Sequence, residues 1–494
     1  MGARIGAEAF ADGDREIFRR RLEDSLFVLD TVLRRPGFGE PADKVGAELE
    51  MFLITEDGTP APVNLAVIAA ARDERLTHEV GSFNLELNLT PRRFAGRPFT
   101  GIQTEIEAVL GLLADVGRQF GALALPIGML PTLRLGDLGS DTMTDVLRYR
   151  VLDRELRRLR DGPFRIDISG PDECAIEADS IAVQAACCSW QVHITAVPEQ
   201  LAITYDAVQL ATAPLLAVSG NSPLLLGQRL WQETRIALYE QGMGDHAAAT
   251  AAGAVPRVSF GSGWTHGTAG IFEDLVRDHE VLVPQWSDED PLTALQRGHN
   301  PRLDELRLHQ STVWRWNRPV YDPAGSVRVE ARALPSGPTP VDMAANTAFL
   351  VGLTTHLTTA GSGFTTALPF VAAKENFYRA AAIGPQALLW WPFPDGVRLL
   401  PAAELVCELI PVAADGLLAL GVDHAEIDRY LSVVRCRATT GRTGARWQQR
   451  AFEALRRRSS TERALHELVH RYDELCTTNE PVHTWPAPFR GATQ

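Results

Sequence analysis

Two glutamates, Glu48 and Glu50, alternate with apolar residues in the segment 44–55. Apolar residues at every second position predict a β-strand with one buried face, so both glutamates lie on the other face. Side chains two residues apart on one strand are about 7 Å apart. Carboxylates that close repel each other unless a cation or hydrogen-bond donors compensate them. For this segment alone, a solvated strand face that carries Glu is the simpler interpretation.

The same alternation recurs in three later segments, 83–89, 190–195 and 326–334. A plain outer strand face is often rich in Lys and Thr, yet Lys44 is the only lysine in the four segments. We therefore infer one antiparallel sheet that packs on its apolar face and binds a ligand on its polar, concave face. The polar faces of the later segments carry Asn84, Glu86 and Asn88, then Gln191, His193 and Thr195, then Arg328, Glu330 and Arg332.

Carboxylates that share a face with histidine and arginine favour a hard cation with anionic oxygen ligands. The set indicates a metal or nucleotide site rather than a solvated surface. The predicted metal ligands are Glu48, Glu50, Glu86, His193 and Glu330.

Three more residues flank these strands. Arg332 shares a face with Glu330, where a planar guanidinium pairs with a carboxylate or binds phosphate. Arg318 precedes Pro319, which disfavours a helix; Arg318 is either a binding residue or a structural arginine stacked on neighbouring tryptophans. Glu79 lies seven residues before Glu86, at the mouth of the strand, and taken alone is a surface acid.

A competing signal is His466-Glu467-Leu468-Val469-His470, a literal H-E-x-x-H. On a helix this motif sets two histidines on one face for zinc, with the glutamate as general base of a metallopeptidase. The alternative is a coincidence on an amphipathic helix. That alternative is favoured because a third ligand is needed and the only acids after His470 are Asp473, Glu474 and Glu480.

Composition sets the class of protein. The 494 residues include 62 acids and 48 lysines and arginines, a net charge of −14 that argues against nucleic-acid binding. Six cysteines in so long a chain are not a disulfide framework and suit a reducing compartment. No apolar run reaches the ~20 residues of a membrane span, and the N-terminus lacks the apolar core of a secretory signal. The sequence thus predicts a cytoplasmic protein with no membrane partner.

Helices and strands alternate along the chain. Helical spacing predicts a helix over 14–34 and another that begins at Thr100, with Gln103 completing a capping box. The segment 142–160 is also predicted helical, with its arginines on a solvated face. Short strands are expected at 121–127 and 188–196, and strands dispersed among helices favour an α+β fold. Further helices are predicted over 341–359, 370–382, 402–420, 424–435, 444–458 and 461–476.

Taken in order, several of these pieces resemble the bacterial type-2 glutamate–cysteine ligases, also called carboxylate–amine ligases. Each piece is weak, whereas the ordered set over 44–350 is fairly specific. The sequence departs from the family at Glu79, where Asp is usual, after His193, where Val-Gly is common, and in a longer helical tail. The matching pieces are Gly46-x-Glu48-x-Glu50, His78-Glu79, Glu86 in Asn84-Leu85-Glu86-Leu87, Gln191-Val192-His193, Ser219-x-x-Ser222-Pro223, Arg318-Pro319 and Val329-Glu330-x-Arg332.

The resemblance implies a glutamine-synthetase-like catalytic fold, with a curved antiparallel sheet that is lined by magnesium-binding carboxylates and flanked by helices. ATP would bind at one end of the sheet and an amino acid at the other. The predicted division is an N-terminal helical arm over 1–40, a catalytic domain over 41–385 and a helical C-terminal extension over 386–494. Assembly into a homo-oligomer stays open.

The implied activity is that of an ATP- and Mg²⁺-dependent ligase in glutathione-type thiol biosynthesis. It would join L-glutamate to an amine such as L-cysteine through an acyl phosphate. The resemblance assigns Arg332 and Arg318 to catalysis, and Glu79, Arg318 and Gln191 to substrate binding. A guanidino-type phosphotransferase is the alternative enzyme, and a non-catalytic ATP- or amino-acid-binding protein is the alternative outside enzymes.

Overall fold

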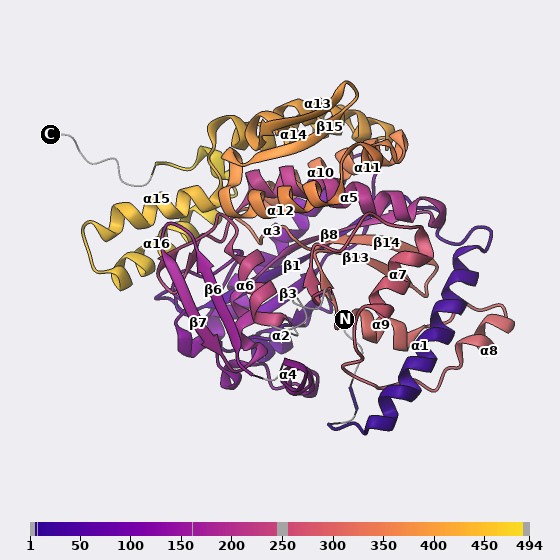
Figure 1. The fold of residues 1–494 in the computed structure, drawn as a ribbon. Helices are drawn as coiled ribbons and strands as arrows, with labels where there is room; N and C mark the ends of the chain where they lie inside the picture. Colours follow the sequence, from indigo (N-terminus) through magenta and orange to yellow (C-terminus); the bar gives the residue numbers. More distant parts are fainter. Residues whose placement is uncertain (1–4, 7, 161, 245–254, 488–494) are drawn as a thin grey trace.

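The computed structural model describes residues 5–6, 8–160, 162–244 and 255–487. Its centre is an eight-stranded sheet in which every neighbouring pair is antiparallel (Figure 1). The four predicted strands are confirmed as neighbours in this sheet. The sheet runs in the order β13 (Asn317–Asp322), β14 (Ser326–Ala331), β8 (Trp190–Ala196), β1 (Lys44–Ile54), β3 (Asn84–Asn88) and β2 (Leu76–His78), with β4 (Arg92–Arg93) and β5 (Leu123–Leu125) also paired to β1.

The apolar face of the sheet packs on two long helices, α5 (Leu201–Ser219) and α10 (Pro340–Ala360). Hydrogen bonds fix this packing: Trp190 Nε1 donates to Thr347 Oγ1 at 3.0 Å, and Tyr205 Oη donates to the Asn317 carbonyl at 2.8 Å. The stretch 198–219 is long and apolar enough to cross a membrane, but 89% of its most apolar window is buried inside the molecule. It therefore serves here as a core helix.

The polar face of β1 is shorter than the alternation predicts. Phe52 follows Glu48 and Glu50 on that face, yet it is fully buried and stacks on Phe83 with ring centroids 6.1 Å apart. At this end of β1 the neighbouring strand is β5, and its apolar Leu125 lies directly opposite Phe52. The open polar face therefore ends at Glu50.

Two predicted helix starts are wrong. The helix predicted from Thr100 is α3 (Pro98–Gly117), which begins at the proline because a proline at the first helical position needs no hydrogen-bond acceptor for its nitrogen. The backbone N–H and hydroxyl of Thr100 donate instead to Glu426, at 2.6 and 2.7 Å. The helix predicted over 142–160 begins later, as α4 (Leu147–Arg160).

The helix predicted over 14–34 is confirmed as α1 (Asp12–Leu33), which lies beside α7 (Thr268–Arg277), α8 (Pro291–Gln296) and α9 (Asp304–Gln310). Arg21 Nε donates to Glu305 Oε1 at 2.9 Å across this contact.

The C-terminal segment is not wholly helical, which corrects the prediction for 386–494. It opens with a hairpin, β15 (Leu388–Phe393) and β16 (Gly396–Pro401), that turns at Pro394-Asp395. The helices α13 (Ala402–Ala419), α14 (His424–Thr440), α15 (Gly444–Arg456) and α16 (Thr461–Cys476) follow. Because α13 packs on α10 and one hydrophobic cluster joins all three predicted parts, the divisions at 40 and 385 remain proposals.

The sequence analysis did not predict the second hairpin, β6 (Phe164–Ser169) with β7 (Glu173–Ala178), or the helix α6 (Thr234–Met243). The remaining elements are α2 (Asn64–Ala71), α11 (Gly363–Ala367), α12 (Phe370–Ile383), β9 (Leu224–Leu225), β10 (Gln228–Arg229), β11 (Val258–Ser259) and β12 (Trp314–Arg315).

Candidate active site

The strand register sets the polar side chains in rows across the sheet. One row places His193 opposite Glu330, which is in turn opposite Arg318. The next row places Glu48 opposite Gln191. A third row places Glu50 opposite Glu86. Directly opposed side chains on neighbouring strands are about 5 Å apart, so the rows bring residues distant in sequence into contact.

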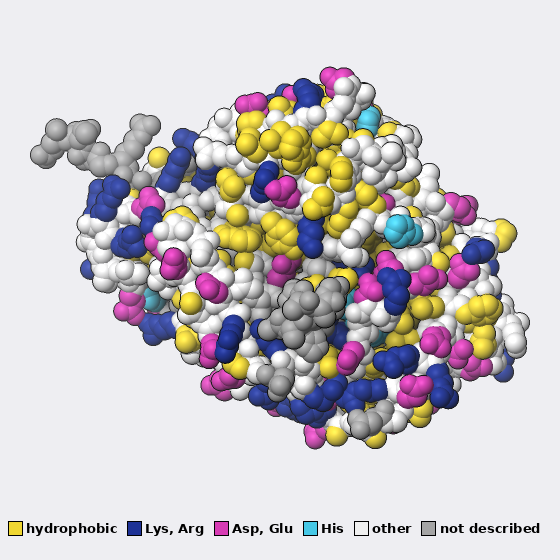
Figure 2. Space-filling model, viewed as in Figure 1, with side chains coloured by type: hydrophobic (Ala, Val, Ile, Leu, Met, Phe, Trp, Pro, Cys, Tyr) yellow, Lys and Arg dark blue, Asp and Glu magenta, His cyan; other side chains and the backbone are white. Residues whose placement is uncertain are grey.

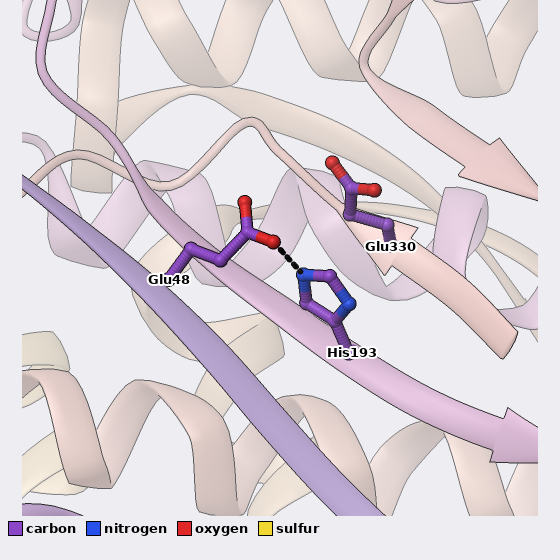
Figure 3. A group of neighbouring side chains, drawn as sticks. All are labelled: Glu48, His193 and Glu330. Atoms are coloured by element: carbon purple, nitrogen blue, oxygen red, sulfur yellow. Dashed lines mark ion pairs between the residues drawn. The ribbon is translucent and has the colours of Figure 1, made fainter. Parts of the chain in front are cut away.

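The first group of possible metal ligands comprises Glu48, His193 and Glu330, here called the histidine cluster (Figure 3). One ligand atom from each residue lies within 4.8 Å of the others. His193 Nε2 is 3.2 Å from Glu48 Oε1. Burial alone would raise the pKa of Glu330, but its ion pairs with Arg318 and Arg332 hold that pKa well below its usual range. Burial also acts on Glu48, and His193 outweighs it and lowers the Glu48 pKa.

The second group comprises Glu50, Glu79 and Glu86, here called the glutamate cluster, whose ligand atoms also lie within 4.8 Å of one another. Burial raises the pKa of all three carboxyls, that of Glu86 to about 8. Neighbouring carboxylates raise the pKa of Glu79 and Glu86 further, whereas Arg332 and Arg235 oppose the effect of burial on the pKa of Glu50. Hydrogen bonds to Ser189 and Gln191 satisfy Glu50 only in part. Three neighbouring carboxyls, one buried and two half-buried, whose charge the protein neutralises only in part, fit a divalent cation such as Mg²⁺.

The structure brings Glu79 into the glutamate cluster, whereas the sequence analysis assigned it to substrate binding. Glu79 follows β2 directly, and the pairing of β2 with β3 places it beside Glu86. Glu79 lies in a loop, where side chains follow no regular alternation, so only the strand pairing places it.

The histidine cluster fits a cation less directly. Arg328 Nε donates to His193 Nδ1 at 2.9 Å, which places the proton of a neutral imidazole on Nε2, toward Glu48. A metal ion bound at Nε2 would need that proton on Nδ1 instead, and the contact with Arg328 would have to break.

Both predicted arginines reach the site and are held by Glu330. Arg318 forks onto this carboxylate, with Nε and Nη2 each bonded to Oε2 at 3.1 and 2.7 Å. Arg332 pairs with Glu330 from the other side and donates to Gln191 Oε1 at 2.6 Å. Arg318 is therefore a carboxylate-paired arginine rather than one stacked on tryptophan, and Gln191 orients Arg332 as well as Glu50.

Arg235 is a site residue that the sequence analysis missed. It is 2% exposed, and Nη1 donates to Glu233 Oε1 at 2.9 Å and to the Ala333 carbonyl at 3.1 Å. Glu233 is in turn bound by Ser222 Oγ at 2.6 Å. The Ser219-x-x-Ser222-Pro223 turn was thus the one sequence signal that could have indicated Arg235. Its Ser222 binds the Glu233 carboxylate, which positions Arg235.

Arg148 of α4 was assigned to a solvated face, and the structure corrects this. It is partly buried and donates to Ser311 Oγ at 2.9 Å. Burial lowers the pKa of Arg148, and the nearby carboxylate of Glu79 opposes that effect. Three other arginines of the helix, Arg154, Arg157 and Arg158, are exposed as predicted, and they pair with the buried carboxylates of Asp153 and Glu155.

Two cavities open at opposite ends of the polar face. A cavity of about 50 Å³ adjoins the glutamate cluster and is lined by Glu50, Glu79, Arg235, Tyr239, Trp316 and Arg332, among others. A larger cavity of about 440 Å³ adjoins the histidine cluster, and its lining includes Lys44, Glu48, Asn88, His193, Ser326 and Arg328. Each cavity therefore has its own group of possible metal ligands. Arg332 links the two groups, because it pairs with Glu330 of the histidine cluster and lines the cavity beside the glutamate cluster.

The H-E-x-x-H motif lies on α16, away from these groups. His466 Nδ1 bonds to the Asp57 carbonyl at 2.6 Å. Over the described ranges of the chain, the groups that bring three ligand atoms together are the two clusters above, and neither includes His466 or His470. The motif therefore belongs to an amphipathic helix whose apolar side, with Leu468 and Val469, is buried.

Replacing His466 and His470 together with alanine should leave the metal content and the predicted ligase activity unchanged, because neither side chain lies in a ligand group. Metal analysis after dialysis, with a parallel activity assay, checks this. Loss of stoichiometric zinc from the variant would restore the metallopeptidase interpretation.

Comparison with known proteins finds solved structures of similar fold and one matching family. A crystal structure of glutamate–cysteine ligase from Francisella tularensis in complex with AMP superposes with a TM-score of 0.56 at 13% identity, covering 92% of this chain and 91% of that one. A bifunctional glutathione synthetase from Pasteurella multocida gives a TM-score of 0.49 at 12% identity, covering 94% of this chain and 55% of that one. A comparison with curated protein sequences finds no match. The model of glutamate–cysteine ligase family 2 matches residues 44–469, so the chain belongs to this family and is a carbon–nitrogen ligase.

Proposed function

We propose that this ligase joins the γ-carboxylate of L-glutamate to the amine of L-cysteine, with ATP as the energy source. The observation that carries the proposal is the pair of carboxylate-rich groups, linked by Arg332, each of which adjoins its own cavity. A reaction that brings a nucleotide and an amino acid together needs a cavity for each, with positive charge where the phosphoryl group is transferred.

The larger cavity is the proposed ATP site. Lys44 and Arg328 supply positive charge there, and its volume of about 440 Å³ suits a nucleotide better than the 50 Å³ cavity does. The related Francisella enzyme was crystallised with AMP, which supports a nucleotide site in this fold.

The smaller cavity is the proposed amino-acid site. Arg235 is buried there, and a guanidinium is the preferred partner of a carboxylate because it can bind both oxygens at once. We assign Arg235 to the α-carboxylate of glutamate, which would direct the γ-carboxylate toward Arg332.

The proposed chemistry has two steps. An oxygen of the γ-carboxylate attacks the γ-phosphorus of ATP, so that ADP leaves and an acyl phosphate forms. The amine nitrogen then attacks the acyl carbon, the amide bond forms, and inorganic phosphate leaves with the bonding electrons. Arg332 stabilises the charge on the transferring phosphoryl group, and Arg318 holds Glu330 so that Arg332 keeps its position.

The glutamate cluster, Glu50, Glu79 and Glu86, would hold one Mg²⁺. The histidine cluster, Glu48, His193 and Glu330, would hold a second once the contact of Arg328 with His193 Nδ1 is broken. Bound there, the cations would neutralise phosphate charge during the transfer. In this proposal Glu79 acts as a metal ligand rather than in substrate binding.

Trapping with hydroxylamine tests the first step by itself. Purified protein with Mg²⁺, ATP and L-glutamate, but no amine substrate, should form a glutamyl hydroxamate, because hydroxylamine attacks an acyl phosphate readily whereas a free carboxylate is a poor electrophile. The hydroxamate is measured by its coloured iron complex, and phosphate release with a panel of amines then identifies the natural acceptor.

Two outcomes contradict the proposal. If no amino acid or dicarboxylate gives a hydroxamate while a guanidino compound becomes phosphorylated, the enzyme is a phosphotransferase. If ATP binds and is never consumed, the protein is a binding protein.

A further inference from the structure

A glycine-rich loop, Gly261-Ser262-Gly263, precedes α7 and lines a third cavity. The cavity lies where the first half of α5 faces this loop and α7. Its volume is about 170 Å³, between those of the two cavities of the polar face. It is separate from the proposed ligase site, because its lining residues line neither of those cavities. The lining includes Tyr205, Gln209, Trp264, Ile271 and Arg315.

The alternation of side chains directs Arg315 away from the proposed amino-acid site. Arg315 ends β12 and lies between Trp314 and Trp316, which both line the small cavity beside the glutamate cluster. Successive side chains of an extended strand point to opposite sides. Arg315 therefore lines the third cavity, on the other side of β12.

The charge of Arg315 is compensated only in part. The residue is 5% exposed, and its Nε and Nη2 have no hydrogen-bond partner among the described residues. The carboxylate of Asp278 lies 3.6 Å from Nη2, and Arg277 Nε already donates to it at 2.9 Å. The buried Arg235, in contrast, donates to Glu233 at 2.9 Å. A buried cation is unfavourable unless an anion contacts it directly, so a ligand carboxylate would complete the environment of Arg315.

Gln209 offers the complementary group in the same cavity. Its side chain is 1% exposed, and its Nε2 donates to the Phe260 carbonyl at 2.8 Å, which fixes the orientation of the amide. Gln209 Oε1 is buried and accepts no hydrogen bond from the part of the chain that the structure describes. A buried acceptor without a donor is destabilising. The cavity thus has a cation for a carboxylate and an acceptor for an ammonium, the two charged groups of a free amino acid.

Other lining residues favour an aliphatic side chain on that amino acid. Ile271 is 2% exposed, and the indole N–H of Trp264 already donates to the Leu368 carbonyl at 2.9 Å. These two side chains therefore offer mainly apolar surface to a ligand. The charged lining residues Asp274 and Arg277 bond to each other at 2.6 Å, so neither requires a charged ligand side chain.

The third cavity adjoins the surface of the molecule. A surface cavity of about 630 Å³ beside α1 and α7 shares His266, Asp274 and Arg277 with it, which gives a ligand a route of entry. Figure 2 shows acidic and basic side chains interspersed over α1 and α7, at the right of the view. Selection for a carboxylate therefore depends on the buried guanidinium rather than on a surface of one charge.

We propose that the third cavity binds a free α-amino acid with an aliphatic side chain, such as L-leucine. Arg315 binds its carboxylate, Gln209 Oε1 accepts a hydrogen bond from its ammonium, and Trp264 and Ile271 contact its side chain. The proposal goes beyond the proposed ligase function and does not depend on it, since the two polar cavities take no part in this binding.

Isothermal titration calorimetry of the full-length protein, without ATP or Mg²⁺, tests the proposal with three probes. L-Leucine should bind at a single site. Isoamylamine, which is leucine without its carboxylate, should not bind, because nothing would then compensate Arg315. Isocaproate, which lacks only the ammonium, should bind more weakly than L-leucine, because Gln209 Oε1 would stay without a donor.

Three variants place the bound amino acid. Arg315→Gln should weaken L-leucine binding by about 10-fold or more, because it removes charge-assisted hydrogen bonds. Arg34→Gln is the matched control, since Arg34 lines the neighbouring surface cavity but not the third cavity, and its affinity should equal that of the wild type. Arg235→Lys, in the small cavity of the ligase site, should also bind L-leucine normally.

Three results overturn the proposal: no binding of L-leucine to the wild type at millimolar concentration, equal binding of isoamylamine and L-leucine, or loss of binding in a folded Arg235→Lys variant. The last result would place the amino acid in the small cavity. If Arg315→Gln does not fold, the two analogues still decide the question with wild-type protein, because only a site that requires a carboxylate distinguishes isoamylamine from L-leucine. Since no ligase substrate other than the probes is present, failure of the proposed ligase function leaves this test unaffected.

Discussion

Replacing Glu48 or Glu50 with glutamine is expected to lower ligase turnover by at least about 100-fold while the protein stays folded, because each change removes one charge from a group of possible cation ligands. Glutamine keeps the size of the side chain and one acceptor oxygen, so packing changes little. Steady-state phosphate release, measured over a range of Mg²⁺ concentrations, checks the result. A matched control is Glu177→Gln, at an exposed strand glutamate on β7, which should retain full activity.

The melting temperature of the Glu50→Gln variant shows whether this variant is folded. Burial raises the pKa of Glu50, so the folded state binds the proton more tightly than the unfolded state does. Without Mg²⁺, this group therefore favours folding most below its unfolded pKa of about 4.3, and the advantage is lost as the pH rises toward the raised folded pKa. Above that pH the variant should melt at a higher temperature than the wild type, and Mg²⁺ should stabilise it less. If Glu48→Gln and Glu50→Gln both kept near-normal turnover at sub-saturating Mg²⁺, the predicted metal site would be rejected.

Arg332→Lys is expected to lower turnover by more than about 10-fold, because lysine cannot reproduce a planar fork that contacts Gln191, Glu330 and a phosphoryl group together. The loss should appear in kcat, since the proposed contact of Arg332 with the transferring phosphoryl group would form in the transition state. Single-turnover hydroxamate formation measures this step directly.

The matched control for this change is Arg229→Lys. Arg229 is 21% exposed against 17% for Arg332, and it also binds two acids, Asp172 and Glu453, but it lines neither cavity. It should keep normal turnover. If Arg332→Lys left the turnover rate unchanged, Arg332 would have only a structural role, as the ion-pair partner of Glu330.

Much of the catalytic face could be predicted from the sequence. Side-chain direction along a strand is a local property, so alternation by itself put Glu48, Glu50, Glu86, His193 and Glu330 on one face. The family assignment followed from the order of short motifs and is confirmed over 44–469. The glutamine-synthetase-like fold remains a prediction, whereas an α+β fold with an antiparallel sheet is confirmed.

The alternation of apolar and polar residues could not predict the positions of side chains in loops or in helices that the sequence analysis did not identify. Glu79 joins the glutamate cluster through the pairing of β2 with β3, and Arg235 reaches the site through a chain of contacts from Ser222 to Glu233. The hairpin at 388–401 was assigned to a helical segment because its two faces are both apolar, and a period of two is then hidden.

The sequence by itself thus determined which residue types face the same side of each strand, and hence the acids, histidine and arginines of the polar face. Only the tertiary structure decided that these residues divide into two groups, that Arg318 and Arg332 both bind Glu330, and that Arg328 fixes the proton of His193. The physical reason is that the face to which a strand side chain points depends only on its neighbours along the chain. Strand register, burial and charge compensation depend on segments that lie hundreds of residues apart in the sequence.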